Sequence, residues 1–272
     1  MDRWLAAAAA ADAEEDVRHG SQRGDEMPDW IADKKKRLAK IREAKAVLEA
    51  GAKAAAEEET RRRAEAEEQR KAEGRKRSGP PPAPPSEAPD GKAQRNFTDP
   101  ESRILKTKDG YIQGYNAQAA VDAEAQIIVA HGLTPSMSDQ DQFVPLLDTT
   151  EDNLDRKPRE ASADAGYCSE ANLAALAARD IRGYIATGRA KHPSDVKRKI
   201  TGPLTKAMRD KLKRAGWRSR YRLRKQVVEP VFGQIKQDRG FRQFLLRGIE
   251  KVTAEWALIC TAHNLTKLAT AV

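Results

Sequence analysis

Large hydrophobic side chains are missing from a long early part of the sequence. Between Glu49 and Asn96 there is no valine, isoleucine, leucine, methionine, phenylalanine, tyrosine or tryptophan. Such a segment cannot bury enough apolar surface to offset the entropy lost on ordering, which excludes a globular core there. The alanine, glutamate, lysine and arginine that fill it are nevertheless strong helix formers. We therefore expect a charged, solvated helix from about Pro28 to Arg77.

The sequence also has little cysteine and no long apolar run. Its two cysteines, Cys168 and Cys260, lie far apart, which excludes a disulfide framework and the close ligand spacing of a zinc site. This usage is typical of a reducing compartment, and we expect a cytoplasmic protein. No run of 18 apolar residues occurs, so the sequence predicts no membrane-spanning segment and no membrane partner.

Composition divides the chain into three parts. Residues 1–77 form a charged helical region whose apolar residues recur at heptad-like spacing, as in a coiled coil. Residues 78–96 are rich in proline and predict a disordered, extended linker. Residues 97–272 have the composition of a folded domain. The heptad-spaced residues of the first part are Ile31, Leu38, Ile41 and Leu48.

Positive charge is concentrated near the C-terminal end. Residues 197–247 contain 17 lysines and arginines but only three acids, a local net charge of +14 in a chain of net charge +9. Trp217, Tyr221 and Phe232 interleave with the cations and give this stretch apolar surface to bury. A local basic block on a mildly acidic body indicates a surface that binds nucleic acid.

Strand and helix patterns alternate after residue 97 and predict an α/β domain, a mixed sheet flanked by helices. Ser138 with Asp141, and Ser169, resemble helix N-caps. The basic residues 188–215 show no clear apolar period, so we expect an insertion or a mobile loop there. The expected elements are a hairpin of strands 114–121 and 126–133, a helix through Leu147, strand 159–164, helix 170–179, strand 183–187, a helix from about Trp217 carrying Glu229, and a core helix 249–268.

Two isolated carboxylates stand out in this order. Asp164 ends an apolar strand, the place where ligands gather in open α/β sheets, although an aspartate before Gly166 is also typical of a turn. Glu229 is one of the few acids within the basic stretch. Separated carboxylates beside a surface for polyanions indicate metal-assisted phosphodiester chemistry.

Five motifs accompany this element order. They are Phe97-Thr-Asp99-Pro-Glu-Ser-Arg, Gly110-Tyr-Ile-Gln-Gly-Tyr-Asn-Ala-Gln-Ala-Ala-Val-Asp122, Ala163-Asp164-Ala-Gly-Tyr167, Val228-Glu229-Pro-Val-Phe-Gly-Gln-Ile-Lys236 and Glu255-Trp-Ala-Leu-Ile-Cys-Thr-Ala-His-Asn264. Together with the element order, they resemble the DDE-type transposases of bacterial insertion sequences. The resemblance covers about residues 97–272, and residues 1–60 are similar to the helical lead-in of some members. It implies a ribonuclease-H-like catalytic domain.

In that family three carboxylates hold two divalent metal ions, normally Mg²⁺ and alternatively Mn²⁺, and the resemblance implies the same for Asp99, Asp164 and Glu229 as catalytic and metal-binding residues. Hard oxygen ligands suit these ions. The first carboxylate is open between two positions. The local sequence Thr98-Asp99-Pro100 predicts a turn. In the ribonuclease-H-like fold that the resemblance implies, however, the first ligand should lie on the strand before the hairpin, which favours Asp99. The rival, Asp122, lies at the hairpin's own turn.

The resemblance also implies DNA as the partner, both the element ends and the target, with a homodimer in the active complex. The expected activity is cleavage and strand transfer by a polynucleotidyl transferase. The alternatives are an inactive DNA-binding remnant and a ribonuclease-H-like nuclease. Because the family's usual N-terminal region is not recognisable, we expect weak or no activity from the chain alone and similar affinity for end and random DNA. The expected DNA-binding residues are Arg218, Arg220, Tyr221, Arg222, Arg224, Lys225 and Lys236.

Overall fold

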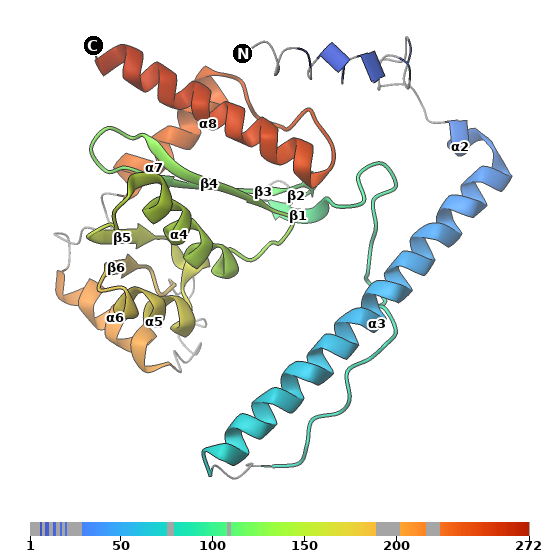
Figure 1. The fold of residues 1–272 in the computed structure, drawn as a ribbon, viewed down its shortest axis with the longest axis horizontal. Coiled ribbons are helices and arrows are strands. Elements are labelled where there is room, and N and C mark those ends of the chain that lie inside the picture. The colour runs from blue at the N-terminus through green and yellow to red at the C-terminus, as the bar shows by residue number, and fades with distance from the viewer. Residues whose placement is uncertain are drawn as a thin grey trace. The chain divides into compact units, whose positions relative to one another are not determined.

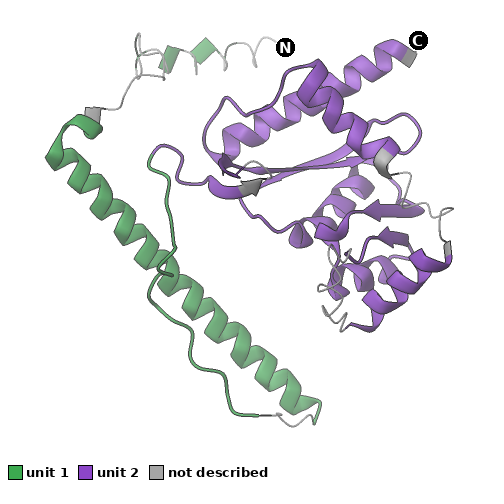
Figure 2. Cartoon of the chain, turned by 180° about the vertical axis from the view of Figure 1, so that it is seen from behind, with its two compact units in different colours: residues 1–97 green, residues 98–272 purple. Residues whose placement is uncertain are grey.

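The computed structural model divides the chain into two compact units, Met1–Phe97 and Thr98–Val272 (Figure 2). The structure describes residues 29–74, 79–107, 110–188, 202–215 and 224–271, together with single positions between 6 and 20.

The first unit contains the expected charged helix. It is present as a short helix α2 (Asp29–Ala32) and the 39-residue helix α3 (Lys34–Ala72). Asp33 separates the two, because its side chain accepts hydrogen bonds from the backbone N–H groups of Lys35 and Lys36 and so caps α3.

The proline-rich segment runs back alongside α3 (Figure 1). Arg63 Nη1 donates a hydrogen bond to the carbonyl of Ala83 at 2.8 Å. The helix residues Ala44 and Ala56 are buried. The heptad positions Leu38 and Ile41 are 47% and 48% exposed, so pairing with a partner helix stays a prediction.

Three two-stranded sheets form the β-structure of the described part of the second unit. The α/β class is confirmed, whereas one continuous ribonuclease-H-like sheet is not seen among these residues. The first hairpin was not predicted from the sequence. The sheets are antiparallel β1 (Arg103–Thr107) with β2 (Gly110–Gly114), antiparallel β3 (Asn116–Val121) with β4 (Ile128–Thr134), and parallel β5 (Glu160–Ala163) with β6 (Arg182–Ile185).

Helices follow the strands in the expected order. Ser169 caps α5 as predicted, accepting a hydrogen bond from the N–H of Asn172. The helical elements are the 3₁₀ turns η1 (Gln140–Gln142) and η2 (Ala165–Tyr167), the helices α4 (Phe143–Leu154), α5 (Glu170–Ala178), α6 (Pro203–Ala215), α7 (Arg224–Gly233) and α8 (Ile249–Ala271), and the π-helical turn η6 (Gln234–Asp238).

Of the two alternatives for residues 188–215, an insertion or a mobile loop, the mobile loop was wrong for the second half. Helix α6 occupies Pro203–Ala215, and its Met208 packs against the buried cluster of β5, β6 and α5. Leu204, Met208 and Leu212 recur every four residues, which places them along one side of a helix. The many intervening cations concealed that spacing.

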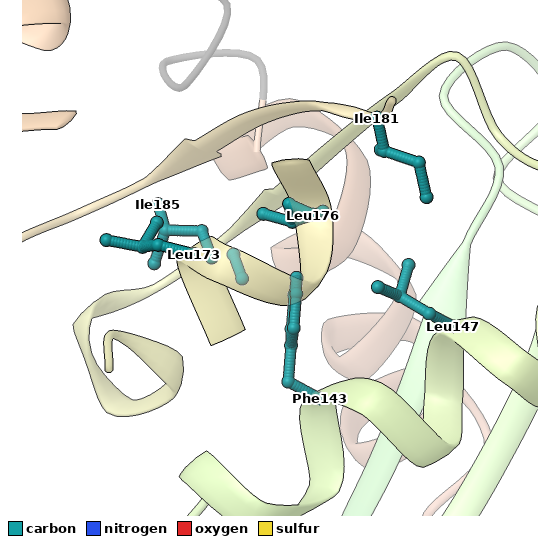
Figure 3. Packing of buried hydrophobic residues seen from close by; sticks show 7 residues of the cluster. Phe143, Leu147, Leu173, Leu176, Ile181 and Ile185 are labelled. Carbon is teal, nitrogen blue, oxygen red and sulfur yellow. The ribbon is translucent and has the colours of Figure 1, made fainter. Parts of the chain in front are cut away.

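Two buried clusters hold the second unit together. One joins α4, α5, β5 and β6 (Figure 3). The other joins β3, β4, α7, η6 and α8, with Trp256 of α8 at 3% exposure. Helix α8 covers one face of the β3–β4 hairpin and α4 covers the other (Figure 1). No helix in the described residues is long and apolar enough to cross a membrane.

Candidate carboxylate site

Asp164 lies directly after β5, at the carboxyl end of that strand. Its Oδ1 accepts a hydrogen bond from the N–H of Gly166 at 2.9 Å, so the side chain also caps η2. Asp164 therefore has both positions that the sequence left open: it ends a strand and it also stabilises a turn. The remaining carboxylate oxygen is not used by this cap.

Asp139 is a second carboxylate at the same place, and it was not among the site residues predicted from the sequence. It lies at the start of η1, yet its side chain makes no capping hydrogen bond to that turn. Its Oδ1 instead accepts hydrogen bonds from Asn116 Nδ2 at 2.7 Å and Gln118 Nε2 at 2.9 Å. Both amides project from β3, on the face opposite the residues that pack toward α8.

The two carboxylates meet at Gly166. A Cβ atom built on this glycine would lie 2.4 Å from Asp139 Oδ2 and 3.0 Å from Asp164 Oδ1. Only a residue without a side chain fits between them. The connections that follow β4 and β5 therefore lie close together at Gly166.

Tyr167 lies beside the carboxylates of Asp139 and Asp164 and is hydrogen-bonded to Gln118. Burial raises the pKa of its phenol, and the negative charges of Asp139 and Asp164 raise the pKa further, because both oppose ionisation of the ring hydroxyl. The neutral hydroxyl donates a hydrogen bond to Gln118 Oε1. The same glutamine therefore binds Tyr167 through its oxygen and Asp139 through its nitrogen.

Asp99 lies elsewhere, in a turn before β1, so the expectation that it lies on a strand was wrong. The turn that the Thr98-Asp99-Pro100 sequence predicts locally is the structure that forms, rather than the strand expected from the family fold. Asp99 is 8% exposed. Its Oδ1 accepts hydrogen bonds from the Tyr115 hydroxyl at 2.8 Å and the Gly248 N–H at 3.3 Å. The Asp99 carboxylate thereby ties this turn to β3's entry and to the start of α8.

Asp122, the rival first carboxylate, belongs to the turn of the β3–β4 hairpin. Its Oδ2 accepts hydrogen bonds from the N–H groups of Glu124 at 3.1 Å and Ala125 at 2.7 Å. The predicted hairpin is confirmed, and its Asp122 supports the turn itself.

Glu229 is exposed on α7, whereas residues that follow it on the helix pack inward. Val231 is fully buried and Ile235 is 2% exposed, so the apolar side of α7 and η6 is fixed against the second cluster. Pro230 lies inside this helix, immediately after Glu229.

The predicted DNA-binding residues are only partly described. Arg218, Arg220, Tyr221 and Arg222 lie outside the described residues, and of Arg224 and Lys225 only the backbone in the first turn of α7 is described. Lys236 is exposed on η6, with its Nζ 5.9 Å from the centre of the Phe232 ring. Their role stays a prediction.

Residues 86–265 match the family described as the transposase DDE domain. The chain belongs to this family. The match spans both Asp164 and Glu229 and extends through most of α8. No curated protein and no solved structure matches the chain. A DDE transposase acts on DNA, which agrees with the basic stretch.

The family implies divalent metal ions, and the chemistry of the donors suits them, because Mg²⁺ prefers carboxylate oxygens. The geometry does not supply a complete set. Within the described residues no group of three or more histidine, cysteine, aspartate or glutamate side chains is placed to hold a metal ion. The assignment of Asp99, Asp164 and Glu229 as a triad stays a prediction. The structure instead brings Asp139 beside Asp164.

Proposed function

We propose that this DDE transposase cleaves DNA at the ends of an insertion sequence and then joins the resulting 3′-hydroxyl end to target DNA, where it displaces a target 3′-oxygen from its phosphate, in a reaction that requires Mg²⁺ or Mn²⁺. Membership of the transposase family over residues 86–265 carries this proposal. The active form would be a homodimer in the cytoplasm that holds two element ends.

We assign the catalytic role to Asp164 and Glu229 and propose Asp99 as the third carboxylate. Asp164 is fixed at the end of a strand by its bond to Gly166, and Glu229 is carried on a helix anchored by buried Val231. Rigid elements of this kind suit groups that must keep a fixed geometry. The basic stretch would bind the phosphate backbone without sequence preference.

The proposal is tested by nicking of DNA that carries the element ends, with and without Mg²⁺ or Mn²⁺. Under this proposal wild-type protein should nick at a weak but measurable rate, and the isosteric variants Asp164→Asn and Glu229→Gln should each lose on the order of a hundredfold or more in rate. Asp152→Asn, which neutralises an exposed carboxylate on α4, is the matched control and should leave the rate unchanged. Joining of nicked DNA to a second duplex separates a transposase from a nuclease.

A catalytically inactive DNA-binding remnant is the second candidate. The incomplete ligand set among the described residues favours it. It predicts that wild-type protein binds DNA but nicks it with neither metal ion. That result would reject the leading proposal and retain the DNA-binding function.

A further inference from the structure

Pro230 leaves a backbone carbonyl of α7 without its helical partner. In an α-helix the N–H of each residue binds the carbonyl four residues earlier, and proline has no N–H to donate. The carbonyl concerned is that of Gln226. The side chain of Gln126, from the turn of the β3–β4 hairpin, donates Nε2–H to this carbonyl at 2.8 Å. The turn of α7 that bears Glu229 is thus closed by a residue one hundred positions away.

Gln126 is held in place from the other side by α8. Lys267 Nζ donates to Gln126 Oε1 at 2.7 Å, and His263 Nε2 lies 2.9 Å from the Gln126 carbonyl. An ammonium group only donates, which assigns the amide oxygen to Lys267 and leaves the amide nitrogen for Gln226. Both ends of the Gln126 side chain are therefore used.

The backbone of Gln126 is unusual as well. Its φ of 58° lies in the left-handed region, which a residue with a side chain rarely adopts. Glycine would occupy this position with less strain. We explain the presence of glutamine in a conformation that favours glycine by its side chain, because the Gln126 amide completes the hydrogen bonding of α7.

We propose that Gln126 is a positioning residue for Glu229: it replaces the hydrogen bond that Pro230 removes and so fixes the helical turn from which Glu229 projects. The inference rests on the proposed function. It acts through the backbone of residues 226–230, since Gln126 touches Gln226 rather than the Glu229 carboxylate. Loss of the amide would free this turn to shift while buried Val231 and Ile235 still hold the rest of the helix.

The test uses Gln126→Gly alone and combined with Pro230→Ala. The first change keeps the left-handed backbone and removes the amide. The second restores an N–H at position 230 that binds the Gln226 carbonyl directly, which makes the Gln126 amide redundant. We expect Q126G to lower the nicking kcat on the order of tenfold or more, as small misplacements of catalytic groups do. DNA affinity and KM should stay unchanged, and the loss should shrink when P230A is present.

Asp155→Gly is the matched control, because Asp155 is also a non-glycine residue in the left-handed region, with φ of 50° at the end of α4. It should relieve the same backbone strain and leave kcat unchanged. An equal kcat loss for Q126G with and without P230A would overturn the proposal, and so would no loss at all. A fall in DNA affinity equal to the fall in rate would do the same.

Hydrogen exchange of the α7 amides decides the question independently of activity. Q126G should speed exchange in residues 226–233, and the double variant should restore slow exchange. Unchanged exchange would reject the positioning role even if wild-type protein nicks DNA. Faster exchange in a protein that does not nick would instead reject the proposed function and keep the finding that Gln126 orders this turn.

Discussion

Asp139 Oδ2 lies where a side chain on Gly166 would begin, 2.4 Å from the position of its Cβ atom. Gly166→Ala must therefore displace either the Asp139 carboxylate, which Asn116 and Gln118 anchor, or the η2 turn. Overpacking of this kind costs about 1–3 kcal/mol. We expect a loss of that size in the free energy of unfolding, measured by denaturant titration, together with slower nicking because Asp164 lies on the displaced turn.

The same argument predicts non-additivity. Asp139→Ala removes the atom that a Cβ at position 166 would meet, so the added cost of G166A should be smaller in that background. Gly132→Ala on β4 is the control, since its nearest neighbours would lie at 3.9 Å, an ordinary contact. Equal costs of G166A with and without the Asp139 carboxylate would show that the two do not compete for this space.

Replacement of Asp99 separates a structural role from a catalytic one. Asp99→Ala leaves the buried Tyr115 hydroxyl and the Gly248 N–H without their acceptor, which should cost about 1–3 kcal/mol in unfolding free energy. Tyr115→Phe removes one of the two bonds and should cost about 1 kcal/mol. If Asp99 is the first catalytic carboxylate, Asp99→Asn abolishes nicking while Y115F retains it. Nicking by D99N near the wild-type rate would remove Asp99 from the site.

Local sequence patterns were sufficient for most of the second unit's elements. The β3–β4 hairpin, the Ser169-capped α5 and the core helix α8 each carry their own signal in residue periodicity or capping chemistry. The first hairpin was missed because Phe97–Arg103 and Gly110–Asp122 were interpreted only as family motifs, and no strands were assigned to residues 103–113. Helix α6 was missed because four-residue spacing of apolar side chains was hidden among lysines and arginines.

The candidate site depends on contacts that local patterns do not contain. Asp164 stood out because it ends an apolar strand. Asp139 did not, since its neighbours Ser138 and Asp141 offered a simpler capping interpretation. Its partners, Gln118 and Gly166, come from a strand earlier in the chain and a turn later in it. Only the tertiary fold brings these segments together, and the contact of Gln126 with Gln226 arises in the same way.

Stability of the second unit should fall as pH decreases through the ordinary histidine range. Burial lowers the pKa of His263 below its usual value of 6.5, and the nearby Arg239 and Lys267 lower it further, whereas the bond to the Gln126 carbonyl opposes them. The folded state therefore favours neutral His263, and the unfolded state binds the extra proton. The stabilisation is complete above the unfolded pKa and is lost as pH falls toward the lower folded pKa.

Melting temperatures measured between about pH 7.5 and pH 5.5 test this expectation. His263→Gln should flatten the decline, although it lowers stability at neutral pH. His131→Gln is the companion variant, because burial also lowers the pKa of His131 and gives it a share of the same decline. A decline that persists unchanged in both variants and in their combination would assign the pH dependence to other groups.

The basic stretch should follow the electrostatics of phosphate binding. Replacing Arg218, Arg220 and Arg222 by glutamine should weaken binding to end and random DNA alike, because phosphate contacts carry no sequence information. Each lost contact should reduce the slope of log affinity against log salt by about 0.9.

The control replaces Lys45, Arg61 and Arg62 of α3, three cations that each pair with a glutamate on the same helix. Because each of these cations already has a glutamate partner, their neutralisation should change the slope far less. Equal slopes for wild type and the Arg218–Arg222 variant, measured by fluorescence anisotropy over a salt series, would show that DNA does not contact these arginines.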